Sequence, residues 1–550
     1  MRVPIFAVFF LLITVFSCDL VPEPQQDKRV FRYNQASGIT SLDPAFSRDQ
    51  ANIWGVHQLF NGLVELDEEL NIQPSIAKGW DISEDGRVYT FYLREDVFFH
   101  DHFLFRNKAE RQVTAHDFEY SFRRLTDPKL ASPGAWVFNN VKTTTEGHAF
   151  NALDDTTFQI ELQHPFPPFL GILSMKYCSV VPEKVVGHYG DEFRRNPVGT
   201  GPFYFKIWEE DIKLVMLKNP DYFETDEKGN RLPYLDAVSV SFIIDKQSAF
   251  MEFAKGNLDF LSGLDASYKD ELLTRNGNLN PAYRDRIKLI SQPYLNTEYL
   301  GILVDESQDI VKNSPLRKKK VRQAINYGFD RERMMRYLRN NIGTPALSGI
   351  IPEGLPAFDK DKVKGYHYNP EKARQLLKEA GFPAGEGMPE ITISTTSSYL
   401  DLTTYIQHQL QQLGMDVQID NTPPATLREM VAHSRLNFFR ASWIADYPDA
   451  ENYLSLFYSE NFSPDGPNYT HFKNDTFDAL YEKAQTTVED TQRLNLYREM
   501  DNLVMEEAPV VVLYYDRVLR FVDKEIEGLG SNPLNLLTLK YVQKNSEKNH

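Results

Sequence analysis

The sequence predicts an α/β protein of two or three lobes, with the chain crossing between the lobes more than once. The chain has 550 residues, of which 42% are hydrophobic, and a single core stops growing beyond about 250–300 residues. Short β-like runs dominate the first half. Amphipathic helical patterns followed by β-like runs dominate the second half, which is the alternation of an α/β lobe. Because no internal repeat or long linker separates these parts, we expect the lobes to be interleaved.

The β-like runs are apolar or alternating segments bounded by turn residues. The clearest begins at Val88 and follows Glu84-Asp85-Gly86, a turn sequence that predicts a β-hairpin. The run from Val510 to Tyr515 is apolar enough for the centre of a sheet, and from Lys540 we expect a polar tail. The other predicted strands are 30–33, 158–162, 214–217, 238–243, 299–303, 391–394 and 417–419.

Helices are predicted where apolar residues recur every three or four positions. In the segment 114–125, four apolar residues share one face and Asp117 lies in the first turn. Gly381 and Gly414 end two further helical patterns. The remaining predicted helices are 315–328, 369–380, 400–413 and 475–484.

The first 18 residues have the layout of a secretory signal, with Arg2, an apolar stretch, Ser17 and then Cys18. The stretch is too short for a transmembrane helix. The cysteine at the cut site resembles a bacterial lipoprotein signal, in which the thiol is acylated and becomes the mature N-terminus. We expect a signal peptide at 1–17, a lipidated tether at 18–28, and a mature protein in the cell envelope. The lipid would anchor it to the membrane, facing the periplasm or the extracellular side. The alternative is a buried N-terminal helix with an incidental cysteine.

Composition excludes several classes of protein. Once Cys18 is used for lipid, Cys178 is the only cysteine left, so neither an intramolecular disulfide nor a cysteine-based zinc site can form. The formal net charge of -17 disfavours nucleic acid as a partner. The one dense basic run, Lys318-Lys319-Lys320, precedes a helical pattern, and we expect it to be a solvated helix face. The 28 Tyr and 37 Phe can line a ligand pocket, although most belong to cores.

The sequence carries no recognisable catalytic motif, with no nucleophile elbow, His-Glu-x-x-His pair, phosphate-cradling loop or dinucleotide fingerprint. We therefore expect no enzyme, no catalytic residue and no cofactor. The best metal candidate is His100-Asp101-His102, because alternating strand residues point the same way, but only His116 lies nearby in the sequence. We expect no metal site.

The segment from Ile76 to Asp101 resembles the signature of the family 5 extracellular solute-binding proteins, which are the oligopeptide- and dipeptide-binding components of ABC importers. One such motif is weak evidence, but six in order behind a lipoprotein signal are specific. The five further motifs that resemble this family are 42–44, 113–118, 198–203, 321–331 and 443–449.

The resemblance implies a two-lobe periplasmic-binding-protein-like fold of the class II, cluster C type, with a hinge between the lobes and an extra inserted domain. By this resemblance, domain I is the hinge lobe and contains residues 29–61, 191–292 and 511–550. Domain II is the inserted domain, 62–190, and domain III is the second lobe, 293–510.

A peptide enclosed by protein needs a carboxylate for its amine, a basic group for its own carboxylate, and strand edges for its backbone. Arg440 and Asp446 supply both charges within seven residues, around Trp443. In the oligopeptide-binding proteins that this segment resembles, the Asp pairs with the ligand's α-amine. The resemblance therefore implies Asp446 as the amine acceptor, Arg440 as a partner for the carboxylate of a short ligand, and Trp443 as a pocket wall. The alternative is that Asp446 caps the turn at Tyr447-Pro448.

Arg339 falls where the family's oligopeptide binders carry a lysine that reaches a ligand carboxylate, so the resemblance makes it a fourth ligand-binding residue. Two positions depart from the family. A histidine with a similar role is replaced by Asp401, and a pocket tryptophan is replaced near Pro424. These departures leave ligand length and side-chain preference open.

We therefore expect a monomeric solute-binding component of an ABC importer. It would close two lobes over an oligopeptide or dipeptide and deliver it to membrane permease and ATPase subunits. The alternative on the same fold is a non-peptide ligand such as a nickel chelate, haem or an oligosaccharide. A third possible function on this fold is that of a surface adhesin or a chaperone-like protein.

Overall fold

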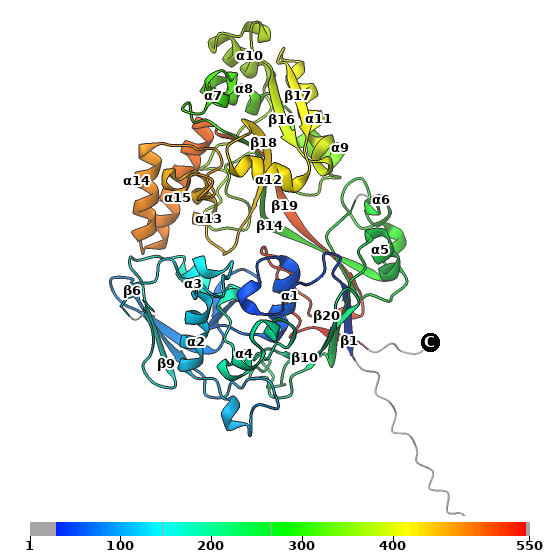
Figure 1. Ribbon diagram of the computed structural model, residues 1–550. Coiled ribbons are helices and arrows are strands. Elements are labelled where there is room, and N and C mark those ends of the chain that lie inside the picture. Colours follow the sequence, from blue (N-terminus) through cyan, green and yellow to red (C-terminus); the bar gives the residue numbers. More distant parts are fainter. Residues whose placement is uncertain (1–28, 146, 266, 546–550) are drawn as a thin grey trace, which may run out of the picture.

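The computed structural model describes residues 29–145, 147–265 and 267–545. The expected signal peptide, the tether and Cys18 lie outside these residues. Figure 1 shows an upper and a lower part connected on one side by two long strands, β14 and β19. Within the described ranges, no helix has the length and hydropathy of a membrane span.

One large mixed sheet extends through both parts, and its strands follow the order β10-β11-β12-β1-β13-β19-β14-β18-β16-β17. Its lower strands are β1 (Val30–Asn34), β10 (Phe203–Glu209), β11 (Lys213–Lys218), β12 (Ala237–Ser241) and β13 (Phe260–Ser262). Its upper strands are β16 (Ile391–Thr395), β17 (Val417–Asn421) and β18 (Phe438–Ile444), and the short β15 (Thr344–Pro345) pairs with β19.

Two long antiparallel strands belong to both parts of the molecule: β14 (Ile287–Ile302) and β19 (Val510–Asp523). Their lower ends pair near Ile287 and Asp523, and their upper ends pair near Gly301 and Val510. The register between them shifts from Pro293 to Thr297. Such a bulge bends the strands and re-aims side chains, and it lies where the upper and lower parts meet.

The lower part also contains a four-stranded antiparallel sheet with the order β4-β5-β9-β8. Its strands are β4 (Ala77–Ile82), β5 (Val88–Leu93), β8 (Phe150–Ala152) and β9 (Thr157–Glu161). Helix α2 (Ala115–Leu125) packs against it through Phe118 and Phe122. The N-cap Thr114 donates its backbone N–H to Asp117 at 2.8 Å, which satisfies one of the unpaired donors at the helix start. The predicted hairpin and this predicted helix are confirmed.

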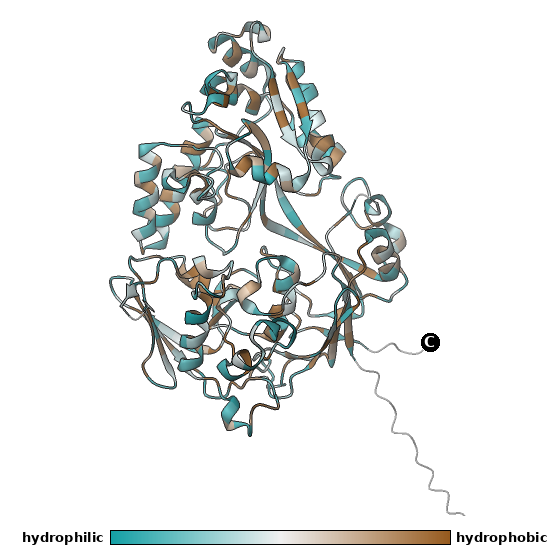
Figure 2. Ribbon diagram, viewed as in Figure 1, coloured by the Kyte–Doolittle hydropathy of each residue, from teal (hydrophilic) through white to brown (hydrophobic). Residues whose placement is uncertain are grey.

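In the upper part, helices cover both faces of the sheet. One face carries α8 (Lys319–Tyr327), α9 (Arg331–Leu338), α10 (Pro370–Glu379) and α11 (Leu400–Gln411). The other carries α13 (Glu451–Leu454), α14 (Asp475–Thr486) and α15 (Asp490–Glu507). In Figure 2 the hydrophilic residues gather on outer helices such as α14, and the hydrophobic residues follow the strands. Each face therefore has its own apolar core.

The remaining elements are short or lie at the margins of the two parts. The helices are α1 (Gln50–Leu59), α3 (Phe169–Leu173), α4 (Glu183–Tyr189), α5 (Lys246–Ala254), α6 (Lys269–Leu272), α7 (Asp309–Lys312) and α12 (Pro424–Ala432). The strands are β2 (Val64–Leu66), β3 (Ile72–Pro74), β6 (Thr143–Thr144), β7 (Gly147–His148), β20 (Ile526–Glu527) and β21 (Gln543–Lys544).

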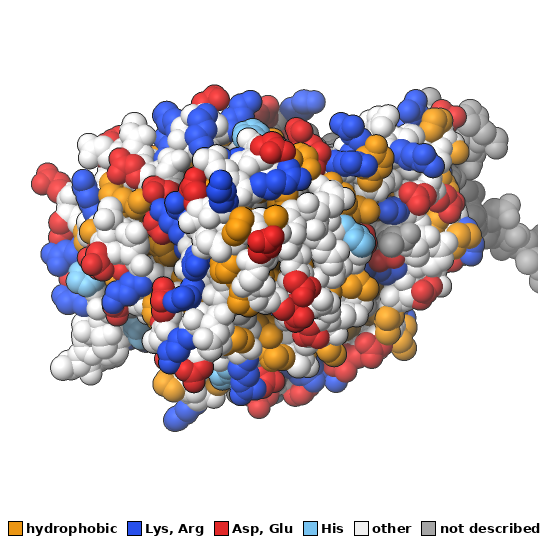
Figure 3. Space-filling model, turned by 90° about the horizontal axis from the view of Figure 1, so that it is seen from above, with side chains coloured by type: hydrophobic (Ala, Val, Ile, Leu, Met, Phe, Trp, Pro, Cys, Tyr) orange, Lys and Arg blue, Asp and Glu red, His pale blue; other side chains and the backbone are white. Residues whose placement is uncertain are grey.

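The prediction of a polar tail from Lys540 is wrong for Lys540 itself. The side chain of Lys540 is buried, and its Nζ donates to Glu65 at 2.8 Å and to Glu224 at 2.6 Å. A buried ammonium is tolerated when carboxylates surround it in this way. By contrast, the surface seen from above in Figure 3 carries both signs of charge side by side.

Candidate functional site

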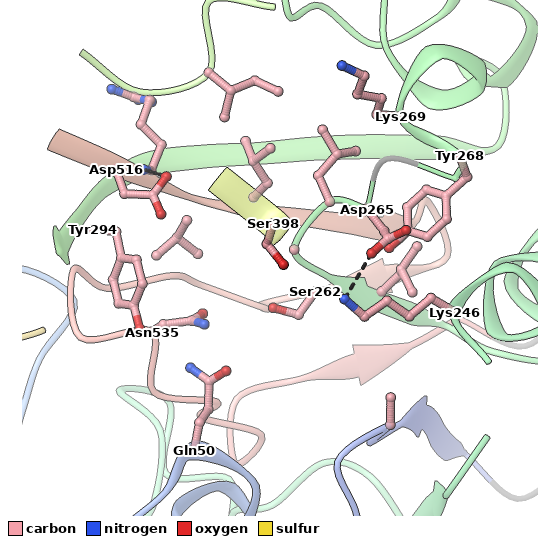
Figure 4. A pocket seen from close by; sticks show the side chains of 18 of the residues that line it. Gln50, Lys246, Ser262, Asp265, Tyr268, Lys269, Tyr294, Ser398, Asp516 and Asn535 are labelled. Carbon is pink, nitrogen blue, oxygen red and sulfur yellow. Dashed lines mark hydrogen bonds and ion pairs between the residues drawn. The ribbon is translucent and has the colours of Figure 1, made fainter. Parts of the chain in front are cut away.

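A cavity of about 610 Å³, here called the larger cavity, opens between the upper and lower parts. Gln50 of α1 contributes to it from below, and Arg339 and Asp401 contribute from the ends of α9 and α11 above. Asp516 of β19 also lines it. Figure 4 shows Tyr294, Asp516 and Asn535 on one side of this cavity and the ion pair of Lys246 with Asp265, 2.9 Å apart, on the other.

A second cavity of about 530 Å³, here called the Asp446 cavity, also lies between the two parts. Asp446 and Trp443 line it from above, and Trp136 and Phe166 line it from below. The rings of Trp136 and Tyr447 lie 6.3 Å apart, so aromatic side chains of both parts meet at this cavity. Aromatic and polar side chains both line this cavity, and such a combination can bind and orient a small molecule.

Asp446 follows the end of β18 and is exposed to its cavity. Because protein surrounds that cavity, desolvation raises the pKa of Asp446 to about 6. Asn452 orients the segment, since its Oδ1 accepts from Trp443 Nε1 at 2.7 Å and from the Asp446 backbone N–H at 3.4 Å. In the described part of the chain, no backbone N–H of the following turn donates to the Asp446 carboxylate. The turn is held instead by Asp449, which accepts from the Glu451 N–H at 2.9 Å.

The aromatic wall beside Asp446 is fixed by a buried carboxylate. Glu451 accepts hydrogen bonds from the hydroxyls of Tyr447 and Tyr481, and all three side chains are buried. Desolvation raises the pKa of Glu451, and the two tyrosine hydroxyls oppose that shift. These bonds leave few rotamers to the two tyrosines, so the cavity is pre-formed.

Arg440 lies on the face of β18 opposite to Trp443, because successive residues of a strand point to opposite faces. Its Nη2 donates to Glu298 Oε2 at 2.5 Å, and its guanidinium lies 3.6 Å from the ring centre of Tyr399. Tyr399 also donates to Glu298, at 3.1 Å. Burial raises the pKa of Glu298, and Arg440 opposes that shift. The structure thus places Arg440 apart from Asp446 and Trp443, and Arg440 lines neither cavity.

Arg339 is at the C-terminal end of α9 and lies over the ring of Tyr514, 5.0 Å from its centre. Its nearest carboxylate is that of Asp516, at 3.8 Å. In the described chain, Nε of Arg339 and Nε of Arg440 are both buried without a hydrogen-bond partner. Asn296 connects the two ion pairs, because its Nδ2 donates to Glu298 at 3.3 Å and to Asp516 at 3.2 Å.

Sequence reasoning missed three polar residues of the hinge strands: Asn296, Glu298 and Asp516. They lie at the bulge between β14 and β19, where the register shift turns side chains toward the interface of the two parts. One feature of the sequence could have indicated this cluster: Glu298 is a carboxylate directly before the apolar predicted strand 299–303. Glu298 is only 2% exposed, and a charge buried within a strand needs a partner.

The first histidine of the metal candidate, His100, has a structural role. His100 Nδ1 accepts from the Gly199 N–H at 3.2 Å, and its Nε2 donates to the Gly201 carbonyl at 3.0 Å. Burial lowers the pKa of His100 to about 4, so the ring is neutral at physiological pH. Among the described residues, no group of three His, Cys, Asp or Glu side chains is placed to hold a metal ion.

Comparisons with known proteins identify the family and the fold of this chain. A family model described as bacterial extracellular solute-binding proteins, family 5 middle, matches residues 71–465. The dipeptide-binding protein DppE of Bacillus subtilis is 25% identical over 540 residues, which cover 94% of this chain and 92% of DppE. The periplasmic oligopeptide-binding protein OppA of Salmonella typhimurium is 27% identical over 534 residues, which cover 94% of this chain and 92% of OppA.

Solved structures share the fold over nearly the whole chain. HbpA2 from Haemophilus parasuis superposes with a TM-score of 0.80 at 22% identity, covering 94% of this chain and all of HbpA2. The periplasmic binding protein DppA from Helicobacter pylori, solved with the peptide STSA, has a TM-score of 0.74 at 25% identity and covers 94% of this chain and 98% of DppA. The two-lobe periplasmic-binding-protein-like fold class predicted from the sequence is confirmed.

Proposed function

Because this chain belongs to the family 5 bacterial extracellular solute-binding proteins, the solute-binding components of ABC transporters, we propose that it captures peptides between its lobes and delivers them to a membrane permease. The observation that carries the proposal is the separation of charge across the site. Among the described residues, Asp446 faces one cavity without a basic partner, and Arg339 faces the other with no carboxylate at hydrogen-bonding distance. A peptide with free termini is a zwitterion and matches both ends.

Other solutes fit these cavities less well. An oligosaccharide site favours stacked aromatic rings with neutral polar groups, whereas here ionised side chains face both cavities. The names of the relatives DppE and OppA refer to dipeptides and oligopeptides, which supports the same ligand class. NikZ from Campylobacter jejuni, a structure with this fold, was solved with Ni(L-His), so a metal chelate is the competing ligand.

The proposed cycle is capture and closure without a covalent step. The open lobes would sample a closed arrangement, and a ligand that contacts both lobes would shift the population toward it. The long strands β14 and β19 are the connection about which the lobes would move. The permease would then recognise the closed form.

The first test is mass spectrometry of whatever co-purifies with the protein after gentle denaturation. We expect a mixture of short peptides within a narrow length range, because the two cavities recognise termini and leave the residues between them less constrained. A single non-peptide compound or a metal chelate would contradict the peptide assignment and leave the solute-binding role in place.

We also propose that the protein is anchored to the membrane by lipid on Cys18, a residue outside the described structure. Cys18→Ser should move the protein from the membrane fraction to the soluble fraction and abolish labelling by a radioactive fatty acid, because the acylated thiol is lost. Cys178→Ser is the matched control, since Cys178 is completely buried and should leave both readouts unchanged. Unchanged membrane association of Cys18→Ser would refute the anchor.

A further inference from the structure

We infer that a cavity beside the hairpin β2–β3 binds a small organic molecule through a primary ammonium group, with the Glu68 carboxylate as its partner. The cavity, here called the hairpin cavity, has a volume of about 450 Å³ and lies between this hairpin and residues 528–541. In the described chain, none of the residues that line it also lines the larger cavity or the Asp446 cavity. This site is therefore separate from the one proposed for the peptide.

Most charged groups of the hairpin cavity already have partners within the protein. Lys540 donates to Glu65 at 2.8 Å and to Glu224 at 2.6 Å. Asp67 accepts from the backbone and side chains of its own turn and from a side chain of strand β3. Arg94 forms an ion pair of 2.9 Å with the aspartate two residues after it. A ligand that paired with any of these groups would have to compete with one of these contacts.

Glu68, in the turn of the hairpin, differs from these groups. It lines the cavity, but no described residue forms a hydrogen bond or an ion pair with its carboxylate. Its Oε1 lies against the opposite wall, since a Cβ built on Gly530 would overlap that oxygen. Desolvation and the neighbouring Glu69 raise the pKa of Glu68, and the charge of Arg520 opposes that shift. Glu68 is therefore the carboxylate that is available to a cation.

Two buried serines of the same cavity have hydroxyl groups without a partner. Ser75 is 4% exposed and Ser531 is 5% exposed, and in the described chain the Oγ of each forms no hydrogen bond. A buried hydroxyl without a partner is unfavourable, so a ligand that donates to it gains binding free energy. Because Ser531 directly follows Gly530, its hydroxyl belongs to the wall against which Glu68 lies.

A primary ammonium group suits these acceptors, because it has three donors and no acceptor. The apolar side chains of the same lining can hold a short aliphatic body. A metal ion fits less well, since among the described residues no group of three His, Cys, Asp or Glu side chains is placed to hold one. The apolar residues of the lining are Leu66, Pro74, Phe223 and Leu536.

The formal charge of the lining also favours a cation over an anion, because carboxylates outnumber charged basic groups. The one histidine of the lining, His57, does not change this balance, since burial lowers its pKa well below its usual value and keeps the ring neutral. The carboxylates are Glu65, Asp67, Glu68 and Glu224, and the charged basic groups are Arg94 and Lys540.

Saturation-transfer NMR titration with pentylamine, which is a primary ammonium ion at neutral pH, tests the inference. Pentan-1-ol is the matched neutral ligand, since it has the same alkyl chain. We expect pentylamine to bind the wild type about tenfold more tightly than pentan-1-ol, because only the ammonium group pairs with Glu68. Asp446→Asn should bind pentylamine as tightly as the wild type does, because Asp446 lines a different cavity.

Glu68→Gln keeps the size of the side chain and removes its charge. It should weaken pentylamine binding about tenfold and leave the affinity for pentan-1-ol unchanged. Glu69→Gln is the matched control, since it removes the neighbouring carboxylate, which does not line the cavity. It should change pentylamine affinity by less than about twofold. Gly530→Ala keeps every charge, but its Cβ would displace the Glu68 carboxylate and should weaken pentylamine binding several-fold.

The inference is overturned if pentylamine binds no more tightly than pentan-1-ol, or if Glu69→Gln weakens its binding as much as Glu68→Gln does. Loss of pentylamine binding in Asp446→Asn would also overturn it, because the amine would then occupy the cavity between the lobes. Wild-type affinity in both Glu68→Gln and Gly530→Ala would exclude Glu68 as the partner. If circular dichroism shows that Glu68→Gln does not fold, Gly530→Ala decides alone.

Discussion

At the scale of single residues, the site depends on carboxylates kept in surroundings that disfavour their charge. No Lys or Arg of the described residues lines the cavity that Asp446 faces, and the raised pKa of Asp446 reflects the desolvation of that position. Glu298 is more deeply buried but has Arg440 as its counter-ion. A cationic ligand group therefore gains more binding free energy at Asp446, whose negative charge has no counter-ion in the described chain, than at Glu298.

Asp446→Asn should weaken peptide binding by about 2 kcal/mol, the scale for leaving a buried charge unpaired. The wild type should also lose affinity as the pH falls below about 6, because protonation of Asp446 removes the partner of the ligand's amine. Calorimetry at pH 5, 6 and 7.5 measures both effects, and the variant should lack the pH dependence.

The pH dependence of folding stability due to Asp446 is opposite in direction to the pH dependence of peptide affinity. Because the folded pKa of Asp446 lies above its ordinary value of 3.8, this residue favours folding at low pH, and that contribution is lost as the pH rises through about 6. Asp309→Asn, at a side chain that is 96% exposed, is the control and should bind peptides as the wild type does. Wild-type affinity of Asp446→Asn at pH 7.5 would exclude Asp446 as the amine acceptor.

At the scale of elements, the three strands β14, β18 and β19 organise the site. Residue Glu298 of β14 faces Ser442 of β18 and Tyr514 of β19, so it projects from the same face as Arg440, two residues from Ser442 along the strand. The close packing of these strands depends on Gly301, which pairs with Phe439. A Cβ at Gly301 would lie 2.6 Å from the Phe439 ring.

Gly301→Ala should lower the free energy of unfolding by about 1–3 kcal/mol, because the added methyl group overpacks the centre of the sheet. Gly79→Ala in β4 is the matched control, since a Cβ there meets no atom within 4 Å, and it should change stability by less than about 0.5 kcal/mol. Urea unfolding followed by circular dichroism measures both. Equal stability of the two variants would contradict the tight approach of β14 and β18.

At the scale of the whole molecule, the division into domains remains our proposal. We propose domain I as residues 29–61, 191–292 and 511–550, domain II as 62–190, and domain III as 293–510. Its support is the course of β14 and β19, whose register shifts near Pro293, beside the boundary at 292. Motion at a strand bulge would change the angle between lobes without breaking either core.

A peptide that contacts both lobes should lower the radius of gyration measured by small-angle X-ray scattering, because it favours the closed arrangement. Tetraalanine at saturating concentration is a suitable probe. Asp446→Asn at the same peptide concentration should show a smaller decrease. An unchanged radius in the wild type, with binding shown by calorimetry, would exclude closure as the response to the ligand.

Much of the fold could be predicted from the sequence. The elements that were predicted correctly have a clear periodicity of apolar residues, which reflects the face that each element buries. The helical patterns at 369–380 and 400–413 correspond to α10 and α11, and the run from Val510 lies in the centre of the sheet as β19. Helix α15 was missed although its apolar residues are periodic. Its buried face includes Arg493 and Asp501, and these charged residues interrupt the apolar stripe.

The site was only partly predictable. The sequence by itself determined the family, the two-lobe fold and the presence of carboxylate and arginine within one segment. Only the tertiary structure decided that Arg440 pairs with Glu298, 142 residues away, and that Asp446 and Arg339 face different cavities. The physical reason is that motifs record neighbours along the chain, whereas strand alternation and strand pairing set which side chains meet in space.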